Sequence, residues 1–243
     1  MWLQAPNILS THGFSTRRGG VSFSPFDSLN LGGSEDQKSN IHHNRKLALQ
    51  ALGLEDQALA TLKQIHSSKV CVAEEGAQEG DALVSKTPGL VLAVSVADCY
   101  PILFEDPKNK IIAAVHAGWR GTVGGIVKNT LEKMLDLGAE TQHLRAAIGQ
   151  GISFKRFEVG DEVLEQFREA GFGDACFENN RIDLAACNKK WMLDLGLNEN
   201  NIWHLNRCTF EEDFFSYRRD KGKTGRMWGV IAIEPFDFDH GRG

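Results

Sequence analysis

The stretch Leu90-Val-Leu-Ala-Val-Ser-Val-Ala97 is the part of the sequence that decides the class of fold. It is a nearly continuous run of valine, leucine and alanine, which is typical of a strand buried on both of its faces. A second run of this kind covers residues 111–116. Both are much shorter than the roughly 18 apolar residues that a membrane-spanning helix needs. The sequence therefore predicts a sheet covered on both sides in a protein without a membrane span.

Weaker patterns place other strands and helices around these two runs. Short apolar segments predict strands, and apolar residues at a spacing of three and four predict helices. Two of the helices open on Asp161 and Asp183, since aspartate is a favoured N-cap residue. About eight strands that do not alternate strictly with helices predict an α+β fold with mixed sheets. Further strands are expected at 11–16, 58–66, 69–73, 146–148, 202–205 and 227–233, and helices at 40–52, 123–135, 161–170 and 183–195.

Composition and charge are those of an ordinary globular protein. The 243 residues are 42% hydrophobic and 24% charged, and we expect a single domain that covers 1–243. The formal net charge of -5 argues against a general nucleic-acid binder. The five cysteines are widely spaced without a Cys-x-x-Cys pair, and no basic segment precedes an apolar stretch at the N-terminus. Because reduced thiols are typical of the cytoplasm, we expect a cytoplasmic protein.

Three potential ligands lie where predicted strands end. His66 closes one strand before a turn, Cys99 follows the first apolar run, and His116 ends the second. Two imidazoles and a thiolate suit a catalytic zinc site, which often takes three nitrogen or sulfur ligands and leaves a fourth position open. The same residues also fit a metal-free pair in which Cys99 is the nucleophile, a histidine is the base and Asp98 orients it. Their spacing alone leaves both interpretations open.

Two glycine-rich basic turns form a second group of candidates. One contains Arg17 and Arg18 before Gly19-Gly20, and the other runs from Arg218-Arg219 to Gly225-Arg226. Guanidinium groups suit phosphate because their fork of N–H donors matches two oxygens at once. Neither turn has the Gly-x-x-x-x-Gly-Lys-Ser/Thr pattern of a phosphate-binding loop, so solvated surface turns are the alternative interpretation.

Taken together, these motifs resemble the laccase-domain, polyphenol-oxidase-like (YfiH-like) family, whose members are described as purine nucleoside phosphorylases. The most specific part is Ala97-Asp-Cys-Tyr-Pro-Ile102 followed by Val115-His-Ala-Gly-Trp-Arg-Gly121. Around 148–157 the chain lacks the proline and cysteines that family members commonly carry, which leaves the substrate preference open. The resemblance covers almost the whole chain, and its other matching stretches are 11–17, 19–22, 28–32, 64–67, 81–84, 157–160, 215–219 and 224–226.

The resemblance implies a single four-layer α/β/β/α domain with mixed sheets. It implies a zinc site built from His66, Cys99 and His116, with copper as the alternative metal. The implied reaction is phosphorolysis of adenosine, inosine, guanosine and 5′-methylthioadenosine to a base and ribose 1-phosphate, with deamination of adenosine in addition. The expected partners are purine nucleosides and phosphate, neither nucleic acid nor a membrane, and the expected state is a monomer or a weak homo-oligomer.

Other residues of the matching motifs receive expected roles in this reaction. Arg17 and Arg218 are expected to hold phosphate by charge-assisted hydrogen bonds. Asp98 or Glu158 is expected to protonate the departing base. The residues expected to bind the substrate are Asn30, Arg120 and Arg226.

Alternative functions remain open at this point. The older family name suggests a copper-dependent polyphenol oxidase, but 8 histidines without a His-x-His pair argue against a multicopper centre and leave a single copper at the same three residues. A hydrolase or amidase that uses Cys99, for example in cell-wall precursor quality control, is a second alternative. A binding module with a structural metal is a third. The nucleobase-deaminase signature with Pro-Cys-x-x-Cys is absent, so any deamination would use a different scaffold.

Overall fold

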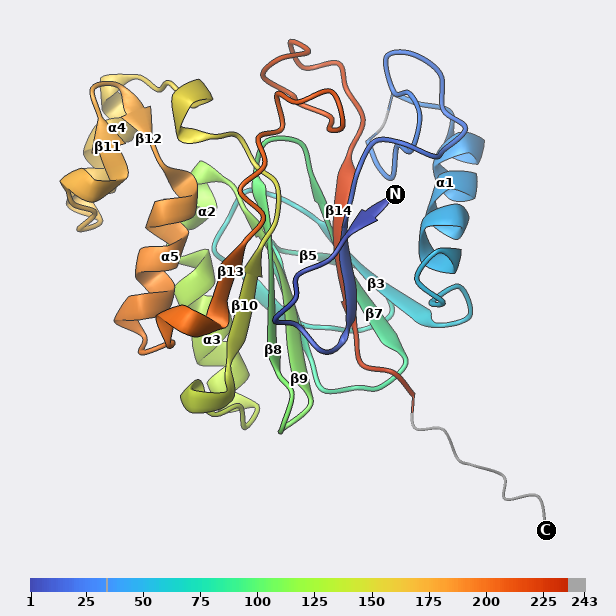
Figure 1. Cartoon of the computed structure of the whole chain (residues 1–243), viewed down its shortest axis with the longest axis horizontal. Coiled ribbons are helices and arrows are strands. Elements are labelled where there is room, and N and C mark those ends of the chain that lie inside the picture. Colours follow the sequence, from blue (N-terminus) through green and yellow to red (C-terminus); the bar gives the residue numbers. More distant parts are fainter. Residues whose placement is uncertain (34, 236–243) are drawn as a thin grey trace.

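The structure, a computed structural model, describes residues 1–33 and 35–235 and consists of two mixed β-sheets packed face to face between layers of helices. Helix α1 (Lys38–Gln50) covers the outer face of one sheet. Helices α2 (Trp119–Val123), α3 (Ile126–Asp136) and α5 (Leu184–Asp194) cover the outer face of the other (Figure 1). This arrangement confirms the predicted α+β class and the four-layer α/β/β/α order.

The first sheet has six strands in the order β1-β2-β14-β7-β3-β5. Neighbours are antiparallel from β1 to β7 and parallel from β7 to β5, so the sheet is mixed. Its strands are β1 (Trp2–Leu3), β2 (Thr11–Ser15), β14 (Met227–Ala232), β7 (Leu90–Val96), β3 (Ala58–Lys63) and β5 (Gly76–Glu79).

The second sheet also has six strands, in the order β13-β10-β8-β9-β6-β4, and is mixed as well. Helix α4 (Asp161–Glu169) and the short hairpin of β11 (Phe177–Glu178) and β12 (Arg181–Ile182) lie at one end of its helical layer (Figure 1). The strands of the sheet are β13 (Ile202–His204), β10 (Arg145–Ile148), β8 (Tyr100–Asp106), β9 (Ile111–Ala117), β6 (Ala82–Ser85) and β4 (Val70–Val72).

The alternation of side chains along β7 explains why its sequence is apolar throughout. Leu92 and Val94 point into the core between the sheets, whereas Val91 and Ala93 point toward α1. All four are buried. Because successive side chains of a strand face opposite sides, a strand between two packed layers needs apolar residues at every position. The prediction of a central strand buried on both faces is therefore confirmed.

Most predicted elements are present, but the strand count is too low. The described residues form fourteen strands instead of about eight, because the sequence-based assignment omitted β1, β5, β6, β8, β11 and β12. Strand β8 was not predicted because it contains Pro101. Proline lacks an N–H group and is unusual in a central strand. Here the proline is the second residue of the strand, and its carbonyl accepts a hydrogen bond from the N–H of Gly149 at 2.9 Å.

Two helix boundaries also differ from the prediction. The helix expected at 123–135 begins only at Ile126, as α3, because Gly125 before it has a φ of 78° and Val123 ends the separate helix α2. The N-cap of α4 is Gly160, so Asp161 is its first helical residue. Asp183 does cap α5, since its side chain accepts a hydrogen bond from the N–H of Ala186 at 2.9 Å.

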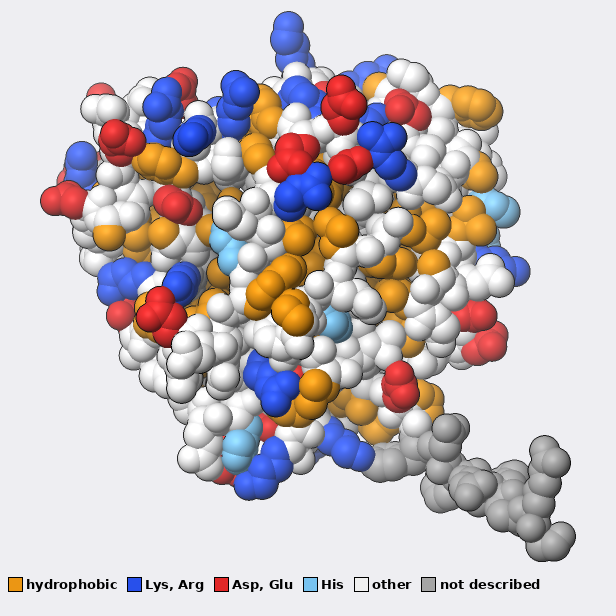
Figure 2. All heavy atoms as spheres, in the orientation of Figure 1, with side chains coloured by type: hydrophobic (Ala, Val, Ile, Leu, Met, Phe, Trp, Pro, Cys, Tyr) orange, Lys and Arg blue, Asp and Glu red, His pale blue; other side chains and the backbone are white. Residues whose placement is uncertain are grey.

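The surface agrees with the modest negative charge of the chain. The face shown in Figure 2 mixes Lys and Arg side chains with Asp and Glu side chains, and no broad basic area covers it. Over residues 1–33 and 35–235, no helix has the length and apolar character needed to cross a bilayer.

Candidate active site

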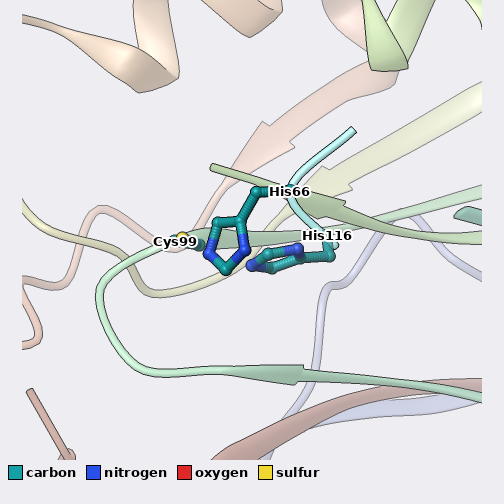
Figure 3. Close-up of side chains that lie close together, drawn as sticks. All are labelled: His66, Cys99 and His116. Atoms are coloured by element: carbon teal, nitrogen blue, oxygen red, sulfur yellow. The ribbon is translucent and has the colours of Figure 1, made fainter. Parts of the chain in front are cut away.

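The three predicted metal ligands come together where the two sheets meet. His66 follows β3 of the first sheet, Cys99 lies between β7 and β8, and His116 belongs to β9 of the second sheet. Their ligand atoms all lie within 4.8 Å of one another, and Figure 3 shows the two rings and the Cys99 side chain grouped together. The ring centroids of His66 and His116 are 4.9 Å apart with the planes nearly perpendicular, at 83°. His116 is buried and His66 is exposed, so the group opens toward solvent.

One buried carboxylate, that of Asp81, holds two of these ligands. Its Oδ1 lies 2.9 Å from Nδ1 of His116 and accepts a hydrogen bond from the N–H of His66 at 3.0 Å, and its Oδ2 accepts one from the N–H of Ser67 at 2.6 Å. The Ser67 hydroxyl donates to it at 2.7 Å. A carboxylate only accepts hydrogen bonds, so Nδ1 of His116 carries the proton and Nε2 is left for a metal. Burial disfavours the charged form of Asp81, but these hydrogen bonds outweigh it and lower its pKa to about 2.

The ligand group combines a readily ionised thiol with a histidine whose charged form is favoured while no metal is bound. Burial disfavours the thiolate of Cys99, but His116 and His66 more than compensate and lower its pKa to about 6. Burial likewise disfavours the charged form of His116, whereas Cys99 and Asp81 raise its pKa to about 9. Two imidazoles and a readily ionised thiol are a donor set that suits zinc and copper alike. The residues therefore fit a catalytic-type metal site with three protein ligands.

Close packing around Cys99 requires a glycine next to it. A Cβ atom on Gly118 would lie 2.9 Å from Sγ of Cys99 and 3.3 Å from Cδ2 of His66. Both distances are too short for an unstrained contact, so the segment after β9 can approach the ligands only without a side chain at this position.

Asp98 joins the ligand group to a distant loop. Its backbone has a φ of 88°, a left-handed conformation that costs free energy for a residue other than glycine. Its Oδ1 accepts a hydrogen bond from the hydroxyl of Thr209 at 2.5 Å, and its Oδ2 accepts one from the N–H of Arg218 at 2.7 Å. Both carboxylate oxygens are thus used to fix the loop of residues 209–218 beside Cys99.

A cavity of about 640 Å³ opens beside the three ligands. Of the other residues predicted for the site, Asp98, Arg218 and Arg226 line it, as does Trp119. The remaining wall mixes apolar and polar side chains, which is typical of sites that bind small organic molecules. It is made by Gly32, Gly33, Arg45, Leu62, Gln64, Ser95, Ala97, Ile152, Phe157, Leu184 and Tyr217.

Two residues predicted to be catalytic do not line this cavity. Arg17 lies in a separate hollow, where its Nη2 is 3.0 Å from Oδ2 of Asp27 and its guanidinium lies 4.6 Å from the ring centroid of Phe215. The carboxylate of Glu158 is paired with Nη2 of Arg181 at 2.8 Å. The structure therefore brings neither charge to the ligand group.

Two of the predicted substrate-binding residues, Asn30 and Arg120, also do not line the cavity. Asn30 is buried, and its Oδ1 accepts hydrogen bonds from the N–H groups of Gly32 at 3.2 Å and Arg226 at 2.8 Å. It thereby positions two segments that do line the cavity. The guanidinium of Arg120 lies 4.4 Å from the ring centroid of Trp119 and forms no part of the lining.

Sequence reasoning assigned no role to several residues that build the site. Asp81 and Gln64 belong to the matching stretches 81–84 and 64–67, which indicate no role for either side chain. The Gln64 amide donates to the carbonyl of Ser95 at 2.8 Å and accepts from its N–H at 2.7 Å, which holds β7 beside the His66 turn. Arg45 left a detectable signal, because it lies four residues from both Ile41 and Leu49 and so on the buried face of α1.

The sequence from residue 11 to residue 234 matches the family described as multi-copper polyphenol oxidoreductase laccase. The chain belongs to this family. It is 45% identical to a purine nucleoside phosphorylase of Deinococcus radiodurans, over 95% of this chain and 92% of that protein. It is 36% identical to adenosine deaminase RL5 of an unknown prokaryotic organism, over 93% of this chain and 95% of that protein. The crystal structure of hypothetical protein YfiH from Bacillus licheniformis has a TM-score of 0.88 at 29% identity, with 92% of each chain covered.

These likenesses confirm the resemblance found in the sequence motifs. The family description includes several copper ions, yet the described residues contain a single group of three or more potential metal ligands, the one at His66, Cys99 and His116. One such group holds one ion. Membership of the laccase family thus agrees with metal binding at this group and leaves the identity of the metal open.

Proposed function

We propose that this protein is a zinc-dependent purine nucleoside phosphorylase that also deaminates adenosine. Its proposed substrates are adenosine, inosine, guanosine and 5′-methylthioadenosine. The names of its relatives support both activities, and a group of two imidazoles and one thiol with room for a fourth ligand supports a catalytic zinc. We also propose that 1–243 works as one catalytic domain, in the cytoplasm, where its five free cysteines would stay reduced.

The observation that carries the proposal is one cavity that combines the ligand group with arginines. Its volume of about 640 Å³ lies within the range of roughly 300–1,000 Å³ that is usual for small-molecule sites. The ligand group lies on one side, and Arg218 and two further arginines contribute to the rest of the lining. A neutral nucleoside and an anionic co-substrate can therefore be held side by side, which a reaction between them requires.

In phosphorolysis an oxygen of hydrogen phosphate forms a bond to C1′ while the bond from C1′ to the base nitrogen breaks. The electron pair of that bond leaves with the purine, and the proton that the phosphate loses is the one that the purine gains. Cavity arginines would attract the phosphate and offset its charge as it approaches the sugar. Zinc, when bound, would supply Lewis-acid catalysis and lower the pKa of water for the deamination.

Of the two carboxyl groups expected to move the proton, Asp98 is the one in the cavity wall. We propose that it fixes the loop of residues 209–218 through its hydrogen bonds to Thr209 and Arg218 and also passes the proton to the departing base. Glu158 and Arg17, which lie outside the cavity, would act by shaping the loops around it.

The test combines metal analysis with a product assay in two buffers. The purified full chain should contain about one zinc, and it should release adenine from adenosine only when phosphate is present. His66→Ala should lose both zinc and activity, whereas His43→Ala, a change at an exposed histidine of α1, should retain both. If the assay gives inosine and no adenine, the protein is a deaminase and the proposed phosphorolysis is wrong. Nucleoside turnover that survives the loss of metal would contradict the proposal and favour a Cys99 nucleophile.

A further inference from the structure

Two half-buried arginines of the cavity wall have no carboxylate in direct contact among the described residues. Within the described part of the chain, Arg45 and Arg226 form no ion pair, whereas most other arginines do, as Arg17 does with Asp27 and Arg181 does with Glu158. Both side chains are only half exposed. A partly buried cation without a counter-charge is costly, so a pair of them on one cavity indicates that a ligand supplies the negative charge.

Arg45 reaches the cavity from α1 in a fixed orientation. Its Nε donates a hydrogen bond to the carbonyl of Leu31 at 2.9 Å, and its guanidinium lies 5.1 Å from the ring centroid of Trp228. Neither terminal nitrogen has a partner among the residues that the structure describes. Burial lowers the pKa of Arg45, and no neighbouring carboxylate offsets this effect. The group is thus held in place with its two outer nitrogens available.

Arg226 reaches the same cavity from the start of β14. Its Nη1 donates to the carbonyls of Thr224 at 2.9 Å and Gly225 at 3.0 Å, while Nε and Nη2 have no partner among the described residues. Its backbone N–H is held by Asn30. Burial lowers the pKa of this arginine as well, although Cys99, Tyr217, Asp98 and Glu35 oppose the effect.

Gly32 and Gly33 line the same cavity as the two arginines. Gly32 lies against Arg226, since a Cβ atom on it would be 3.5 Å from the Cβ of that arginine. Gly33 adjoins two smaller hollows, one lined by Lys38 and Arg45 and the other by Arg226 together with the carboxylates of Glu35 and Asp36, so an anion would enter from the side of the main cavity. It has a φ of 96°, and no atom lies within 4 Å of where its Cβ would be. An anion can therefore come close to the backbone beside the two guanidinium groups.

We propose that Arg45 and Arg226, with the Gly32-Gly33 turn beside them, form the subsite that binds inorganic phosphate. The fork of donors on each guanidinium matches the oxygens of a phosphate group, and two forks offset its double charge. Arg218 contributes less, because it is exposed and one of its nitrogens already donates to the carbonyl of Glu158 at 3.1 Å. The use of this phosphate in catalysis rests on the proposed function, but its binding does not.

The test is a calorimetric titration of the zinc-loaded full chain with inorganic phosphate in the absence of nucleoside. Arg45→Gln and Arg226→Gln should each weaken phosphate binding at least tenfold, and the double variant should abolish it. Arg156→Gln is the matched control, because Arg156 also lies over an aromatic ring, at 5.2 Å from Phe210, but outside the cavity. It should bind phosphate as the wild type does. Circular dichroism and zinc content verify that each variant is folded.

Kinetics separate this proposal from the proposed function. In phosphorolysis the same two variants should raise the KM for phosphate at least tenfold and change the KM for the nucleoside less than threefold. Phosphorolysis with an unchanged phosphate KM, or with an effect confined to Arg218→Gln, would overturn the subsite and leave the proposed function intact. Phosphate binding that depends on Arg45 without any phosphorolysis would overturn the function and leave the subsite intact. A parallel titration with adenosine 5′-monophosphate tests the other source of a phosphate group, and binding tenfold tighter than inorganic phosphate would overturn the assignment to the free anion.

Discussion

Replacement of Asp81 by asparagine is the change that tests the site most directly. Four hydrogen bonds of 3.0 Å or less end on this carboxylate, from the N–H groups of His66 and Ser67, the Ser67 hydroxyl and Nδ1 of His116. Asparagine has nearly the same shape but keeps one acceptor oxygen and places N–H donors where the second oxygen was. About half of the four hydrogen bonds would be lost. The new NH₂ group of asparagine would also face two protein groups that themselves donate hydrogen bonds.

The size of the effect follows from these bonds. A hydrogen bond to a buried charged group contributes about 1.5–3 kcal/mol, so the loss of two predicts a decrease of about 3–6 kcal/mol in the unfolding free energy of the metal-free protein. Zinc affinity should fall by about 10–100-fold, the usual effect of removing the partner of a ligand histidine. That decrease corresponds to about 1.4–2.7 kcal/mol of binding free energy.

Urea unfolding of the metal-free protein and competition for zinc with a chromophoric chelator measure the two quantities separately. Asp106→Asn is the matched control, because Asp106 is a buried carboxylate with hydrogen bonds from Lys108, Asn109 and Glu140 but no contact with the ligand group. It should lose stability and keep its zinc affinity. If Asp81→Asn bound zinc as tightly as the wild type, Asp81 would not position the ligands and the reasoning would be refuted.

Three further changes probe the packing, the loop contact and the pH dependence. Gly118→Ala would place a methyl group 2.9 Å from Sγ of Cys99, so we expect an at least tenfold loss of zinc affinity and about 1–3 kcal/mol of stability; wild-type zinc binding in the chelator assay would show that the segment moves aside freely. Thr209→Val removes the hydroxyl that donates to Asp98 and should lower kcat at least tenfold with zinc content unchanged, whereas Thr209→Ser should retain activity; equal kcat values for the two variants would contradict a role for this hydrogen bond. Burial disfavours the charge of Asp106, but the hydrogen bonds from Asn109 and Glu140 outweigh it and keep its pKa below the ordinary value. Its contribution to stability is therefore complete above the ordinary aspartate pKa of about 3.9 and is lost as the pH falls through its lower folded-state pKa, so urea unfolding should show Asp106→Asn about 2–4 kcal/mol less stable than the wild type at pH 7 and nearly equal at strongly acidic pH. A difference that persists unchanged into acid would mean that the charge of Asp106 is not what stabilises the fold.

The sequence alone determined the central strands and the ligand group. The apolar runs predicted β7 and β9 because a strand between two packed layers requires apolar residues on both faces. His66, Cys99 and His116 were recognisable because chemically reactive side chains at the ends of such strands stand out from their surroundings, and because their motifs resemble one family. These are local signals, carried by neighbouring residues.

Only the tertiary structure decided which charged residues serve the cavity. Arg17 and Arg45 are equally basic in the sequence, but Arg17 is paired with Asp27 in a separate hollow, and Arg45 faces the cavity from α1 without a carboxylate partner among the described residues. Asp81 likewise gained its role because the pairing of β6 with β9 brings it to His116, 35 residues further along the chain. Such contacts depend on how distant segments pack, and neither composition nor periodicity contains that information.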